Sequence, residues 1–112
     1  MKLPGADNLI VEREKIVDYL LNASHPDNSG KAEFFLDLGF KRSHWQLMAA
    51  AFRNAVANQS ISKIMASPHG TKCIVEGRVE TPNGKAPWVR TVWIVDFGKD
   101  EPRLVTDYPY KE

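Results

Sequence analysis

The feature that most constrains the fold is a change in the spacing of apolar residues near Asn58. Before Asn58 they recur every three or four positions, as Ile16 and Leu20 do, whereas "TKCIVEGRVE" later alternates apolar and polar residues. The first period is typical of helices and the second of strands. The sequence therefore predicts helices from about residue 12 to 58, followed by strands from about 60 to 108.

The first half divides into three predicted helices. The first begins near Glu12 and ends before Pro26, and the second follows the turn-forming run "PDNSG". The third opens at Ser43, which with Gln46 has the spacing of a capping box. Apolar side chains define the inner faces of the second and third helices: Ala32, Phe35 and Leu36 in one, and Trp45, Met48, Ala49, Phe52 and Val56 in the other.

The second half predicts a four-stranded antiparallel meander. Asn83-Gly84 marks a hairpin turn, because this pair suits positive backbone φ. The run "PWVRTVWIVD" is apolar on both faces and is expected in the middle of the sheet. Helices and strands that are segregated along the chain indicate an α+β fold, with the three helices on one face of the sheet. A chain of 112 residues is expected to form one domain, 1–112.

Composition narrows the function classes. The net charge of +1 counts mildly against tight, non-specific nucleic-acid binding, although a local basic site remains compatible with it. The single cysteine, Cys73, permits no internal disulfide, and its apolar neighbours favour a buried residue over a nucleophile. No signal peptide or membrane span is recognisable, so we expect a cytoplasmic protein. No motif for a cofactor is present, and scattered histidines do not predict a metal site.

His25 is the first candidate for chemistry. It lies in the predicted turn between the first two helices, with Lys31 shortly after it. A histidine is a suitable general base near neutral pH, and a lysine can offset phosphate charge. The alternative is a solvent-facing or capping histidine in a turn. His44 and His69 are expected to be exposed.

Arg90 and Thr91 are the second candidates, because a charge in the middle of a central strand is costly without a partner. Adjacent strand residues point to opposite faces, so only one of the two can face the helices. Arg90 either pairs with a carboxylate on a neighbouring strand, such as Glu76 or Asp107, or belongs to a site. Tyr108 and Arg103 on the last strand are expected close enough to share that site.

Four segments, in this order, resemble a bacterial domain family of unknown function. They are "LPGADNLIVEREKIVDYLLN", "HPDNSGKAEFFLDLGF", "VRTVWIV" and "PRLVTDYP", and the resemblance covers nearly the whole chain. That family occurs as a standalone protein and at the C-terminal ends of polymorphic toxins and phage-associated proteins. It has no established activity, so the resemblance implies a toxin-related module without specifying its chemistry.

A second, weaker analogy concerns the order of the elements. Toxin tails with helices before a four-stranded antiparallel sheet are often metal-independent ribonucleases similar to the barnase, colicin and RelE group. Under this analogy His25, Lys31, Arg90 and Thr91 would supply the base, the cations and a hydroxyl. The alternative is a non-catalytic protein-binding module of a phage, defence or immunity system. Convergence of His25 with Arg90 would favour the enzyme, and an exposed patch of aromatic residues (Trp88, Trp93 or Tyr110) would favour a protein partner.

Overall fold

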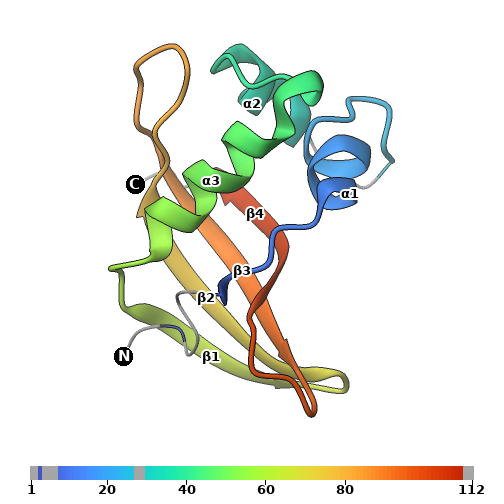
Figure 1. Cartoon of the computed structure of the whole chain (residues 1–112), viewed down its shortest axis with the longest axis vertical. Helices are drawn as coiled ribbons and strands as arrows, with labels where there is room; N and C mark the ends of the chain where they lie inside the picture. The colour runs from blue at the N-terminus through green and yellow to red at the C-terminus, as the bar shows by residue number, and fades with distance from the viewer. Residues whose placement is uncertain (1–2, 4–7, 27–29, 110–112) are drawn as a thin grey trace.

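The computed structural model describes residue 3 and residues 8–26 and 30–109 of the chain. An α+β fold is confirmed: the helical segments come first and a four-stranded sheet follows (Figure 1). The helical segments are α1 (Arg13–Lys15), the π-helix η2 (Ile16–Leu20), α2 (Lys31–Asp37), the 3-10 helix η3 (Arg42–His44) and α3 (Trp45–Val56). The strands are β1 (Ile61–Ser67), β2 (Gly70–Arg78), β3 (Trp88–Asp96) and β4 (Arg103–Pro109).

The sheet is the predicted antiparallel meander, with the strands in the order β1-β2-β3-β4. β3 is an interior strand of the sheet, as its apolar sequence predicts. In the pairing register, Glu76 on β2 lies opposite Arg90 on β3, and Arg90 lies opposite Tyr108 on β4. Side chains paired across antiparallel strands share a face, so these three form one row across the sheet.

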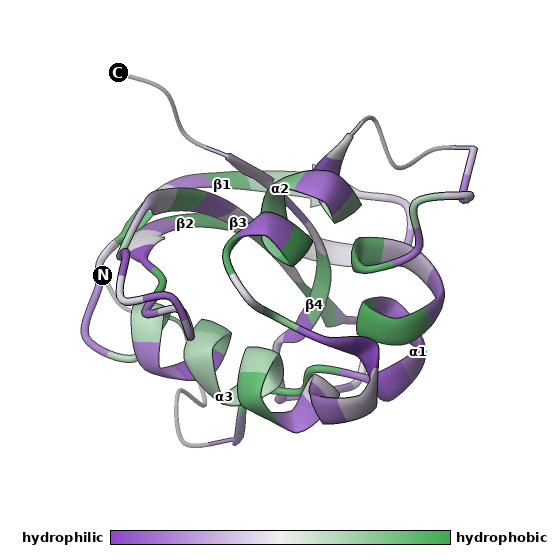
Figure 2. Cartoon of the chain, turned by 90° about the horizontal axis from the view of Figure 1, so that it is seen from above, coloured by the Kyte–Doolittle hydropathy of each residue, from purple (hydrophilic) through white to green (hydrophobic). Residues whose placement is uncertain are grey.

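Helix α3 packs across one face of the sheet and carries most of the predicted stripe (Figure 1). In the view from above, the curved sheet lies on one side of the molecule and α3 on the other (Figure 2). Met48, Ala49, Phe52 and Val56 are buried, whereas Trp45 is only partly buried. Together with Phe35 of α2 and the inner faces of the strands, they form one core.

Two details of the helices differ from the predictions. Ser43 does not cap the third helix: it lies in η3, and α3 begins at Trp45 with no side-chain cap. The 3-10 turn supplies the entry to α3 instead, so the capping-box spacing was misleading. Leu36 is 39% exposed, because the buried side of the short α2 runs through Ala32 and Phe35, and Leu36 lies beside it.

The N-terminal segment covers the outer edge of β4. Ile10 forms a parallel bridge with Arg103. Its amide donates to the carbonyl of Pro102 at 2.9 Å, and the amide of Leu104 donates to the carbonyl of Ile10 at 2.9 Å. This places α1, η2 and α2 at the β4 edge, where side chains from helices and sheet can meet. In the part of the chain that the structure describes, no helix is long and apolar enough to span a membrane.

Candidate functional site

The sheet separates Arg90 from Thr91. Thr91 is fully buried on the face that the helices cover, where its hydroxyl donates to the carbonyl of Val75 at 2.7 Å and accepts from Trp93 Nε1 at 2.7 Å. Arg90 lies on the opposite face, which no helix covers, and its side chain is 44% exposed. Thr91 therefore serves the core, and it does not meet Arg90.

Arg90 forms an ion pair with Glu76 across the two central strands, with Arg90 Nη2 3.6 Å from Glu76 Oε2. This is one of the two carboxylates named from the sequence; the other, Asp107, lies on the covered side, opposite Thr91. The pair stays partly open to solvent, since 25% of the Glu76 side chain is exposed. A ligand can therefore reach the guanidinium without unfolding the sheet.

Lys31 lies at the centre of a polar cluster at the β4 edge. The residue is only 5% exposed, and its ammonium group donates to the hydroxyls of Tyr19 at 2.8 Å and Thr106 at 2.9 Å. Those two hydroxyls lie 3.1 Å apart. The same ammonium is 4.4 Å from the centre of the Tyr108 ring, a distance at which a cation is attracted to the face of the ring.

His25 joins this cluster through Tyr19. The two rings are 5.0 Å apart between centres and meet edge to face. The turn Leu21–Pro26 after η2 holds His25 there, with the His25 amide donating to the carbonyl of Asn22 at 3.1 Å. His25 and Tyr19 also line a cavity of about 330 Å³ beside α1 and η2, with Arg103 of β4 also in its lining. The turn between the two helices is therefore also part of a polar surface.

Three of the four predicted site residues thus lie along one continuous strip. It runs from His25 through Tyr19 to Lys31, from Lys31 to Tyr108, and from Tyr108 to Arg90 beside it in the sheet. Sequence reasoning missed Tyr19 and Thr106. The alternation of β4 does place Thr106 on the same face as Tyr108, but the reach of Lys31 around the sheet edge has no signal in the sequence.

Asp107 lies beneath this strip, on the covered side of β4. It is fully buried, and neither carboxylate oxygen has a hydrogen-bond partner among the residues that the structure describes. Burial raises the pKa of Asp107 to about 7, and the positive charge of Lys31 opposes this rise. A buried carboxyl of this kind favours its neutral form in acid and becomes a costly charge in base.

The charges are unevenly distributed, although their sum is close to zero. On the helix-free face the register places more basic than acidic residues: Lys63, Lys72, Arg78, Arg90 and Arg103, against Glu76 and Asp96. Within the described ranges, Lys63, Lys72 and Arg78 form no ion pair. This face is therefore a local basic surface, although the net charge of the chain is only +1.

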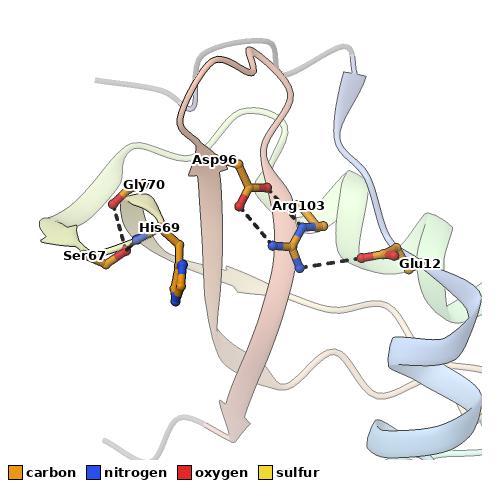
Figure 3. Close-up of polar contacts among 6 residues, drawn as sticks. All are labelled: Glu12, Ser67, His69, Gly70, Asp96 and Arg103. Atoms are coloured by element: carbon orange, nitrogen blue, oxygen red, sulfur yellow. Dashed lines mark hydrogen bonds and ion pairs between the residues drawn. The ribbon is translucent and has the colours of Figure 1, made fainter.

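Arg103 fixes one end of this face (Figure 3). Its guanidinium donates to Asp96 at 3.2 and 3.3 Å and lies 3.7 Å from the Glu12 carboxylate. The hydrogen bond from Arg103 lowers the pKa of Asp96, and Asp96 in turn raises the pKa of Arg103. Arg103 therefore links β4 to the end of β3 and to Glu12, which precedes α1, and it borders the cavity beside His25.

Other candidates lie outside the strip. Cys73 is buried on the covered face, as expected, and burial raises the pKa of its thiol, which disfavours a thiolate nucleophile. His44 and His69 are exposed, as expected. Across residues 8–26 and 30–109, no three His, Cys, Asp or Glu side chains gather in a way that could hold a metal ion.

Comparison with known proteins identifies a family for this chain and a solved structure with a similar fold. No curated protein matches the chain. Among solved structures, a chain of the "Contact-dependent growth inhibition toxin - immunity protein complex from Klebsiella pneumoniae 342" matches with a TM-score of 0.75 and 24% identity, over 96% of this chain and 97% of that one. At this identity the likeness shows a shared fold. Residues 2–111 match the family described as "Domain of unknown function (DUF6883)", and the chain therefore belongs to that family.

Proposed function

We propose that this chain is a toxin-type domain that cleaves RNA without a metal ion. One observation carries the proposal: the Lys31 ammonium lies between the Tyr19 and Thr106 hydroxyls and over the Tyr108 ring, and so links His25 to Arg90. The strip then brings together a base at His25, an exposed cation at Arg90, the buried positive charge of Lys31 and several hydroxyls. These are the groups that phosphate chemistry requires.

Each residue has a distinct role in the proposed reaction. His25 removes the proton from the ribose 2′-hydroxyl as this oxygen attacks the adjacent phosphate. The P–O5′ bond breaks, a 2′,3′-cyclic phosphate forms, and the departing 5′-oxygen takes a proton from water. Arg90 is the solvent-accessible cation and stabilises the added negative charge on the phosphate oxygens. Lys31 is too buried to serve as a freely moving contact, so it acts mainly by its charge and by orienting the Tyr19 hydroxyl. Thr91 has no part, because its hydroxyl is engaged in the core.

The fold comparison also supports a toxin-type domain. The similar chain comes from a complex of a growth-inhibition toxin with its immunity protein, and a toxin that cleaves RNA would inhibit growth when expressed. A toxin of this kind would also have an immunity protein as partner. The basic helix-free face supports an anionic substrate despite the overall charge of +1.

The test compares the wild type with His25→Ala, Arg90→Gln and the control His69→Ala. His69 is exposed in the turn after β1, away from the strip. We expect wild type and His69→Ala to cleave RNA and inhibit growth, and each site variant to lose roughly 10²-fold or more in cleavage rate while remaining folded. A wild type that neither cleaves RNA nor inhibits growth would refute the proposal, and full activity in both folded site variants would refute this site.

The alternative is a non-catalytic protein-binding module, such as an immunity component. The observation that favours it is a groove of about 480 Å³ between α3 and the β2–β3 connection, lined by Leu47, Ala50, Ala51 and Pro82. Leu47 is 60% exposed there and forms part of the apolar lining together with Ala50, Ala51 and Pro82. Under this alternative Leu47→Asp abolishes binding of a partner protein, and no variant of His25 or Arg90 changes any activity.

A further inference from the structure

We infer that the helix-free face of the sheet is a binding surface for single-stranded RNA, on which Trp88 and Tyr108 stack unpaired bases next to Arg90. The choice of RNA as the nucleic acid rests on the proposed function. The location and the mode of binding rest on the geometry of the sheet.

The two aromatic side chains are exposed within a regular sheet. Trp88 is 38% exposed and Tyr108 is 50% exposed. The register pairs Tyr108 with Arg90, and Trp88 lies two residues before Arg90 on the same strand, so all three share the helix-free face. Trp88 and Tyr108 are thus diagonal neighbours across β3 and β4, with a spacing of roughly 7–8 Å. This leaves each ring able to take its own base.

Tyr108 is held in place for such a contact. The Lys31 ammonium lies 4.4 Å from the centre of its ring, and this contact occupies one face of the ring. The other face remains for a base, since half of the residue is exposed. A ring fixed by a cation loses little conformational freedom on binding, which favours stacking.

Charge complementarity identifies the occupant as a polyanion. Arg90 neighbours both aromatic residues, opposite Tyr108 and two positions from Trp88, and Arg78 lies opposite Trp88 on β2. Lys72 and Lys63 continue the basic surface across β2 and β1. Aromatic rings interleaved with basic side chains are the pattern of surfaces that bind single strands, where bases stack and phosphates meet cations. Exposed aromatic residues alone would favour a protein partner, but here basic side chains surround them: Arg90 and Arg78 beside Trp88, with Lys72 and Lys63 beyond. This combination favours a nucleic-acid strand.

The same surface discriminates against a duplex. In double-stranded RNA the bases are paired and stacked inside the helix, so the sheet surface cannot bring Trp88 or Tyr108 against a base face. Only an unpaired strand can turn its bases onto the sheet while its phosphates stay near Arg90. Single-stranded segments are therefore the substrate class that we assign to the site.

Binding is best measured with a labelled single-stranded 2′-O-methyl oligonucleotide, which lacks the free 2′-hydroxyl and stays intact. We expect Trp88→Leu to weaken binding roughly tenfold, Trp88→Phe to retain most of the affinity, and Phe97→Leu to bind as the wild type does. Phe97 is a matched control, because it is 71% exposed but follows the far end of β3. Rescue by Trp88→Phe separates stacking from a purely structural role.

The inference fails if folded Trp88→Leu binds as tightly as the wild type, or if a duplex of the same sequence competes equally well. It also fails if the protein does not bind the single strand at all. Failure of the proposed function gives a different pattern: the protein binds the single strand through Trp88 but leaves unmodified RNA intact. Cleavage of RNA with no effect of Trp88→Leu on binding gives the reverse pattern, in which the function holds and the surface does not.

Discussion

The ammonium group of Lys31 lies 2.9 Å from the hydroxyl of Thr106 and joins α2 to the edge strand β4 across 75 positions of the sequence. The contact brings a residue of the helical half onto the helix-free side of the sheet. Without it, the interhelical turn and the sheet would carry separate polar groups. The candidate site therefore depends on this bridge as much as on His25 or Arg90.

Lys31→Met tests the bridge. The substitution keeps an apolar stem of similar length but removes the ammonium group. The two hydroxyls lose a charged donor, and the ionised form of Asp107 loses the positive charge that stabilises it. We expect the free energy of unfolding at pH 8 to fall by roughly 1–3 kcal/mol, with a smaller loss at pH 5, where Asp107 is protonated. The control is Lys41→Met, at an exposed position, and equal losses in both variants would contradict the bridge.

Asp107→Asn tests the buried carboxyl. The folded pKa of about 7 exceeds the unfolded value of roughly 3.9, so between these values the folded chain holds a proton that the unfolded chain has lost. The contribution of Asp107 to stability therefore falls as pH rises through this window, by roughly 4 kcal/mol in all. In denaturant titrations from pH 4 to 8, the free energy of unfolding of Asp107→Asn should therefore fall less with rising pH than that of the wild type.

The exposed Asp37 on α2 provides the comparison for that series. Asp37→Asn should keep the pH dependence of the wild type, because the histidines and all other titrating groups are unchanged. If Asp107→Asn and Asp37→Asn gave parallel curves from pH 4 to 8, Asp107 would not be the group that retains the proton.

Much of the fold follows from the local pattern of the sequence. The alternation in β2 indicates a strand with one apolar face, the run of β3 indicates a central strand, and the turn signals between the strands favour a meander. The site follows less directly, because strand alternation separates Arg90 from Thr91 without indicating which of them faces the helices. Only the packing of α3, with Phe52 on its buried side, against the face that carries Val75 decides this.

The remaining errors have a common physical origin. Ser43 and Leu36 satisfy local rules for a helix cap and an apolar stripe, but tertiary packing determines where a short helix begins and which side it buries. The reach of Lys31 is of the same kind. A buried lysine with hydroxyl partners on a distant strand leaves no periodic signal, so composition predicts an exposed residue.

Gly77→Ala tests the contact between sheet and helix. A Cβ atom at Gly77 would clash with the carbonyl oxygen of Ala55 near the end of α3, so the helix must shift to accept it. We expect a loss of roughly 1–3 kcal/mol in the free energy of unfolding. Gly98→Ala is the comparison: its added Cβ meets open space and suffers only from the positive φ of 78°. A thermal melt of Gly77→Ala at or above that of Gly98→Ala would contradict the close approach.

Phe52→Ala tests the packing of α3 against the rest of the core. Phe52 is fully buried, and its ring meets that of Phe35 edge to face with centres 5.8 Å apart. Removing the ring leaves a cavity that α2 and the sheet cannot fill without moving, so we expect a loss of roughly 3–5 kcal/mol in a denaturant titration. Leu36→Ala should cost far less, because Leu36 is 39% exposed. A loss below roughly 1 kcal/mol for Phe52→Ala, or one no larger than that for Leu36→Ala, would mean that this face of α3 does not form the core.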